Sequence, residues 1–99
     1  MLDMRKTQDG STLTITLIGR MDAMTSPQFE SEFAESVKGI TKLYLDMRDV
    51  DYVSSAGLRA ILYAQNIMDE QGSMVLLNVQ EEVKEIFLVT GFLDILTLE

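Results

Sequence analysis

Asp49-Val-Asp-Tyr-Val-Ser-Ser-Ala-Gly-Leu-Arg59 is the stretch that decides the fold, because a strand, a turn and a helix meet in it. Residues 42–47, just before it, are mostly apolar, which is typical of a short, mostly buried strand. Residues 56–71 are rich in helix-forming side chains, contain no proline and precede Gly72, so they predict a helix over Ala56–Gln71. Ser54 and Ser55 are therefore expected at the start of a helix.

A serine at this place has two possible functions. Its hydroxyl can accept a hydrogen bond from the N–H groups of the first helical turn, which have no partner inside the helix, and so act as a structural cap. The same N–H groups, together with the positive end of the helix dipole, would also suit an anion such as a phosphate carried on the serine.

Composition narrows the class of protein. The chain of 99 residues is long enough for one modest core, so we expect a single domain over residues 1–99. It shows neither an apolar run of about 18 residues nor a secretory leader, so we expect no membrane span and a cytoplasmic location. The absence of cysteine and histidine argues against a metal site and against most enzymes. The net charge of −8 argues against direct binding of nucleic acid.

The hydrophobic pattern predicts the remaining elements. Threonines alternate with apolar residues in the second predicted strand, and Asp9-Gly10 before it favours a tight hairpin turn. Residues 20–24 are expected to form a loop. The predicted strands are Leu2–Thr7, Ser11–Ile18, Lys42–Met47 and Met74–Val79. The predicted helices run from the Thr25-Ser26-Pro27 cap to about Val37, over Ala56–Gln71 and over Glu81–Thr90.

Two further expectations concern the end of the chain. On the last predicted helix the side chains that can face inward are Val83, Ile86, Phe87 and Leu88. Residues 92–98 are compatible with a helical turn, a terminal edge strand, or both.

The order of elements predicts an α/β fold with a mixed, mainly parallel sheet of four to five strands packed with helices. The strand at Lys42–Met47 follows a helix, so it should lie parallel to the second strand. Function in such folds tends to lie in the loops beyond the carboxyl ends of the strands. We therefore expect the loops Arg20–Ser26 and Tyr52–Gly57 to form one functional surface.

The segment Asp46-Met-Arg-Asp-Val-Asp-Tyr-Val-Ser-Ser-Ala-Gly-Leu-Arg59 resembles the STAS domain of bacterial anti-sigma factor antagonists. Gly19-Arg-Met-Asp22 resembles the upstream signature of that family, and the resemblance covers essentially the whole chain. It implies that Ser55 is phosphorylated by a partner that is both anti-sigma factor and serine kinase. By the same resemblance, the unphosphorylated form binds this partner, phosphorylation releases it, and a serine phosphatase restores binding.

The resemblance also implies a contact surface made of Asp22, Asp51, Ser54, Gly57 and Leu58. Ser54 stands where the family often has aspartate, which leaves Ser54 as a competing phosphoacceptor. An alternative function is a regulatory or scaffold subunit of a transport or signalling complex, with the same surface but no phosphoryl switch.

An enzyme is not expected. A serine hydrolase built on residues 53–57 would need glycine two positions before the nucleophile, where Val53 stands, and a histidine to activate the hydroxyl. The glycine-rich phosphate-binding signature is absent as well, so ATP should be held by the partner and no cofactor is expected here.

Overall fold

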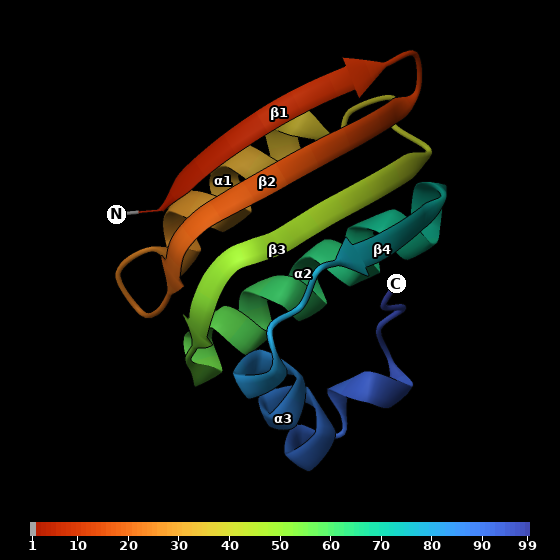
Figure 1. Cartoon of the computed structure of the whole chain (residues 1–99). Coiled ribbons are helices and arrows are strands. Elements are labelled where there is room, and N and C mark those ends of the chain that lie inside the picture. The colour runs from red at the N-terminus through yellow and green to blue at the C-terminus, as the bar shows by residue number, and fades with distance from the viewer. Residues whose placement is uncertain (1) are drawn as a thin grey trace.

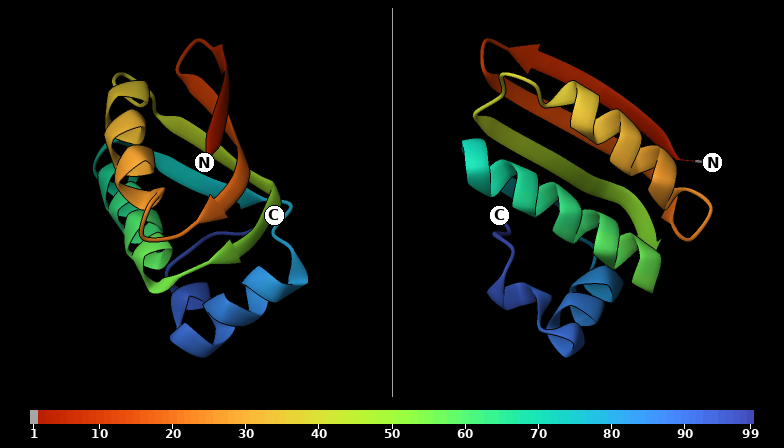
Figure 2. Two further views of the ribbon diagram at one scale, coloured as in Figure 1. Left: turned by 90° about the vertical axis from the view of Figure 1, so that its left-hand side faces the viewer. Right: turned by 180° about the vertical axis from the view of Figure 1, so that it is seen from behind.

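The computed structural model describes residues 2–99, which form a mixed four-stranded sheet and three α-helices. β1 (Asp3–Asp9) pairs antiparallel with β2 (Thr12–Met21), whereas β3 (Lys42–Val53) lies parallel to both β2 and β4 (Ser73–Leu77). The helices α1 (Ser26–Ser36) and α2 (Ser55–Gln71) cover one face of the sheet, and α3 (Glu81–Thr90) lies beyond the end of β4 (Figures 1 and 2). The predicted mixed, mainly parallel α/β fold is confirmed.

The core fills the space between the sheet and the helices α1 and α2. Along β2 the apolar residues Leu13, Ile15 and Leu17 are buried, and the threonines between them are half-buried, as the alternation predicted. On α1 the Phe29 and Phe33 side chains, four residues apart, are also buried, with their ring centres 5.4 Å apart. None of the helices within residues 2–99 is long and apolar enough to cross a membrane.

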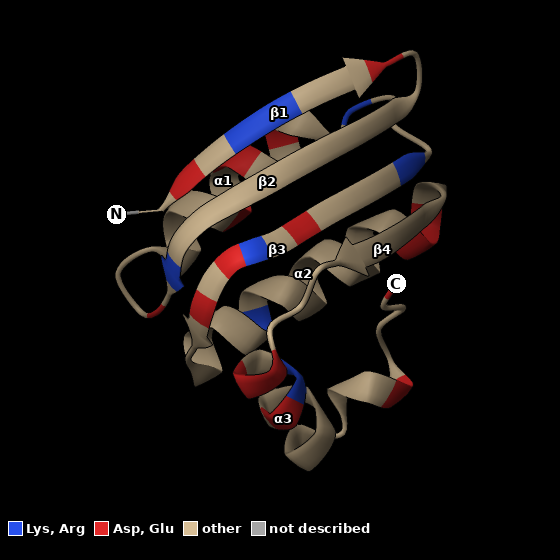
Figure 3. Cartoon of the chain, in the orientation of Figure 1, with Lys and Arg blue, Asp and Glu red and all other residues tan. Residues whose placement is uncertain are grey.

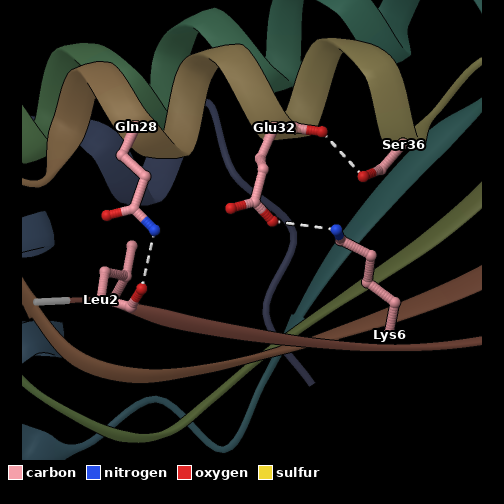
Figure 4. A network of polar contacts seen from close by, with 5 residues as sticks. All are labelled: Leu2, Lys6, Gln28, Glu32 and Ser36. Carbon is pink, nitrogen blue, oxygen red and sulfur yellow. Dashed lines mark hydrogen bonds and ion pairs between the residues drawn. The ribbon is translucent and has the colours of Figure 1, made fainter.

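Polar contacts hold β1 against α1, as Figure 4 shows. The Gln28 side-chain amide donates to the carbonyl of Leu2 at 2.8 Å, and Lys6 Nζ lies 2.9 Å from Glu32 Oε2. The hydrogen bond from Lys6 is the main reason why the pKa of the Glu32 carboxyl is lowered. Glu32 therefore connects α1 to β1 through its ion pair with Lys6.

β3 is twice as long as predicted, and the prediction that it ends at Met47 is wrong. Two register shifts lie between β2 and β3, and in each of them β3 has one more residue than β2. Such β-bulges break the alternation of a strand. After Met47, the next buried residues are Val50 and Val53, three positions apart instead of two, while the pairs 48–49 and 51–52 are exposed.

The predicted ends of β2 and β4 also differ from the structure. β2 continues through Arg20 to Met21, which were expected in a loop. β4 ends at Leu77, because Asn78 takes a positive φ of 56° that stops the strand. Both forms considered for the C-terminal residues occur: a 3₁₀ turn, η1, at Phe92–Asp94, and a parallel bridge from Leu98 to Leu76 at the edge of β4.

Candidate partner-binding site

Ser54 and Ser55 differ in their surroundings. Ser54 is the N-cap of α2, and its Oγ accepts a hydrogen bond from the Gly57 N–H at 3.3 Å. Its own N–H donates to the Met21 carbonyl at 2.8 Å, and the residue is half-buried. Ser55 is the first residue of the helix and is exposed. The structural cap expected of a serine is therefore Ser54, and the accessible hydroxyl is that of Ser55.

The Asp22 loop is a small hydrogen-bonded structure. Asp22 Oδ1 accepts from the backbone N–H groups of Met24 and Thr25, both at 3.0 Å. The Thr25 hydroxyl donates to the Arg20 carbonyl at 2.6 Å and accepts from the Asp22 N–H at 3.0 Å. The bond from the Thr25 N–H is the largest cause of the lowered pKa of the Asp22 carboxyl. Asp22 therefore orders this loop as a carboxylate.

Thr25 occupies the N-cap position of α1, but its side chain makes no cap hydrogen bond. The sequence predicted a Ser or Thr cap there. The hydroxyl is instead used by the Asp22 loop, whose ordering requires the same oxygen.

The two expected loops do meet. The carbonyl of Met21, at the end of β2, receives the Ser54 N–H, and it lies close to Gly57 in the first turn of α2. A Cβ atom built on Gly57 would lie 2.6 Å from that carbonyl oxygen and 2.8 Å from Val53 Cγ1. Only a residue without a side chain lets α2 begin so near the end of β2. Asp22, the next residue after Met21, is thereby placed beside the start of α2.

The implied contact residues differ in exposure. Asp51 is exposed and Asp22 is half-buried, whereas Gly57 and Leu58 are buried on the inner side of α2. Of the five residues implied as a contact surface, Asp22, Asp51 and Ser54 are therefore at least partly accessible, and Gly57 and Leu58 are not.

At the bulged end of β3, an aromatic ring contacts a charged group of β2. The Arg20 guanidinium lies 4.6 Å from the centre of the Tyr52 ring, a cation–π contact between the ends of β2 and β3. Acidic and basic residues follow one another along this curved end of β3, as the red and blue segments of the ribbon show (Figure 3). The three-residue spacing of Met47, Val50 and Val53 was the sequence signal that could have revealed this geometry.

The Asp46 side chain makes hydrogen bonds within the domain. Its Oδ1 accepts from the Arg48 N–H at 3.0 Å and from the Asn78 side-chain amide at 3.1 Å. The Gln80 amide donates to the Arg48 carbonyl at 2.7 Å, so the first bulge is connected to the segment that leads into α3.

Replacing Ser54 by alanine should lower the free energy of unfolding by about 1 kcal/mol, because the Gly57 N–H loses its cap. Ser54→Asp should retain most of the stability, since a carboxylate oxygen also caps a helix. Urea unfolding measures both variants, with the exposed Ser55→Ala as a matched control expected within about 0.5 kcal/mol of wild type. Equal stabilities of Ser54→Ala and Ser55→Ala would contradict the assignment of Ser54 as the cap.

Comparison with known proteins identifies the domain. The family model described as "STAS domain" matches residues 3–99. The chain belongs to the STAS domain family. BtrV of Bordetella bronchiseptica, provisionally assigned as an anti-sigma factor antagonist, is 39% identical over 85 residues, which are 84% of this chain and 73% of that protein. The anti-sigma-B factor antagonist of Bacillus subtilis is 24% identical over 92 residues, which are 92% of this chain and 84% of that protein.

Solved structures agree with the fold of this STAS domain. An anti-sigma factor antagonist from Mycobacterium paratuberculosis superimposes with a TM-score of 0.87 at 15% identity, covering 99% of this chain and 85% of that one. The unphosphorylated form of the anti-sigma factor antagonist SpoIIAA gives a TM-score of 0.82 at 17% identity, covering 98% and 88%. At these identities the structures show that the architecture is shared.

Proposed function

We propose that this STAS domain is an anti-sigma factor antagonist that binds an anti-sigma factor with serine kinase activity and is released when Ser55 is phosphorylated. The observation that carries the proposal is the arrangement of the serines: an exposed Ser55 hydroxyl in the first turn of α2, with Ser54 engaged as the cap. The names of the sequence relatives support the same function.

The switch requires two reactions, phosphorylation of Ser55 and its reversal. The kinase moves the terminal phosphoryl group of its bound ATP to Ser55 Oγ, so a new P–O bond forms, the bond to ADP breaks and the hydroxyl proton leaves. A serine phosphatase hydrolyses the ester and regenerates the hydroxyl. The chain itself supplies the acceptor, and the partner supplies ATP.

Charge explains how phosphorylation would release the partner. Phosphate adds about −1.5 to −2 charges at neutral pH, and the chain already has a net charge of −8. A surface that also includes Asp22 and Asp51 would bring these anions into a desolvated contact, where repulsion is strong. The N-terminal end of α2, 17 residues long, favours an anion, so the phosphate needs no refolding of the domain.

The helix cap made by Ser54 also favours Ser55 over Ser54 as the phosphoacceptor. Modification of Ser54 would require its Oγ to leave the Gly57 N–H and the half-buried site, whereas Ser55 requires no rearrangement. Ser55 is therefore the proposed acceptor, although Ser54 stands where the family often has aspartate. In this proposal the protein acts as a binding module and not as an enzyme, and it works in the cytoplasm.

Intact-mass measurement after incubation with the cognate kinase and ATP tests the switch. Wild type and Ser54→Ala should each gain one phosphoryl group, and Ser55→Ala should gain none. Ser55→Glu should bind the unmodified partner at least about 100-fold more weakly than Ser55→Ala, a difference of about 2.7 kcal/mol. If Ser55→Ala gains phosphate, or if wild type gains none, the assignment of Ser55 as the phosphoacceptor is wrong. Tight binding without any phosphoryl transfer would favour the scaffold subunit instead.

A further inference from the structure

The apolar side chains that the fold leaves exposed are concentrated at one place. Within residues 2–99, seven large hydrophobic residues have substantial exposure. Four of them lie within residues 88–95, and we name them the 88–95 patch: Leu88 at 58%, Val89 at 73%, Leu93 at 37% and Ile95 at 49%. The other three, Met24, Tyr52 and Tyr63, lie on other elements. Clustered apolar exposure of this kind usually marks an interaction surface, whereas single exposed residues are ordinary.

The patch is exposed because of the way α3 packs. Val83 and Phe87, one turn apart, are the buried residues of the helix, and the Phe87 ring stacks against Phe92 of η1 with centres 6.4 Å apart. Leu88 was predicted to face inward, which is wrong, because Phe87 takes the inward position and turns its neighbour to the solvent.

The patch is also held in a defined shape. Gly91, at a left-handed φ of 82°, ends α3, and its N–H donates to the Leu88 carbonyl at 3.3 Å. The Ile95 N–H donates to the Phe92 carbonyl at 3.0 Å, and Leu96 is buried. A fixed apolar surface loses little conformational entropy on binding, which favours its use as a docking site.

The charges around the patch select its partner. Residues 81–99 carry five carboxylate side chains and one ammonium, that of Lys84, whose Nζ lies 3.7 Å from Glu81 Oε1. Red segments accordingly outnumber blue ones on α3 in Figure 3. A second copy of the chain, an anionic membrane or a nucleic acid would bring negative charge against negative charge. We propose that the 88–95 patch is a docking site for a basic amphipathic segment of another protein. This proposal does not depend on the function proposed for Ser55.

A titration followed by methyl NMR tests the docking site. The probes are two synthetic amphipathic helical peptides with the same leucine face, one with lysine and the other with glutamate on the polar face. The lysine peptide should shift the methyl signals of Leu88, Val89, Leu93 and Ile95, and its affinity should fall about tenfold in the Leu88→Ser, Val89→Ser double variant. The glutamate peptide should bind at least about tenfold more weakly, and added salt should narrow this difference.

Two controls distinguish specific docking at the 88–95 patch from non-specific hydrophobic binding. Both serine substitutions are at exposed positions, so the unfolding temperature of the double variant should stay close to that of wild type. Tyr63→Ser removes an exposed apolar side chain from α2 and should leave the affinity unchanged. The proposal is overturned if the double variant binds the lysine peptide as well as wild type does, or if the glutamate peptide binds as tightly as the lysine peptide. It is also overturned if sedimentation shows that the wild-type protein is a dimer and the double variant a monomer.

Discussion

Replacing Gly72 by alanine is expected to lower the free energy of unfolding by on the order of 3 kcal/mol, the upper end of the usual range for overpacking. A Cβ atom at this position would lie 1.8 Å from the carbonyl oxygen of Thr41 and 2.6 Å from its carbonyl carbon. Both atoms belong to the backbone, so no side chain can rotate away. That carbonyl also accepts the Ser73 N–H at 3.0 Å, at the start of β4, so moving it would disturb the pairing of β3 and β4.

Thermal unfolding followed by circular dichroism measures this effect. For a domain of this size, about 3 kcal/mol corresponds to roughly 12 to 24 °C in the unfolding temperature. Gly39→Ala is the matched control, since its Cβ would meet nothing within 4 Å but its φ is +78°. The control should cost about 1 to 2 kcal/mol from backbone strain alone. An unfolding temperature of Gly72→Ala at or above that of the control would refute the steric explanation.

Replacing Gly57 by alanine should destabilise the domain by about 2 kcal/mol and disturb the candidate site at the same time. The added Cβ would lie 2.6 Å from the Met21 carbonyl oxygen and 2.9 Å from Met21 Cβ. The same carbonyl receives the Ser54 N–H, so a shift of α2 away from β2 would weaken the contact between the two loops. We expect the amide signals of residues 21–25 and of Ser54 to move in a nitrogen–proton NMR spectrum.

Helix propensity alone gives the opposite expectation at this position. Alanine favours a helix over glycine by about 0.8 to 1 kcal/mol in a helix interior, so without the collision Gly57→Ala would be neutral or stabilising. Ala56→Gly is the neighbouring control, and it should lose no more than about 1 kcal/mol without moving the signals of residues 21–25. A raised unfolding temperature for Gly57→Ala would show that α2 can begin elsewhere.

Much of the architecture could be predicted because it depends on local patterns. The alternation in β2 and the helix over Glu81–Thr90 both follow from the period at which apolar side chains recur, and both are confirmed. The Asp9-Gly10 hairpin is confirmed for the same reason, since Gly10 takes the positive φ of 62° that a tight turn needs. The strand ends were less accurate, because bulges and the conformation of Asn78 depend on neighbouring strands.

The sequence by itself determined the α/β class, the turn from β3 into α2 and the pair of serines at its start, because propensity, period and turn chemistry act between residues close in the chain. The tertiary structure alone decided which serine is the cap and which is accessible. That choice depends on where the Met21 carbonyl lies relative to Ser54 and Gly57, a contact between residues more than 30 positions apart. The exposure of Leu88 was decided in the same way, by the packing of Phe87 against the rest of the fold, which no local pattern encodes.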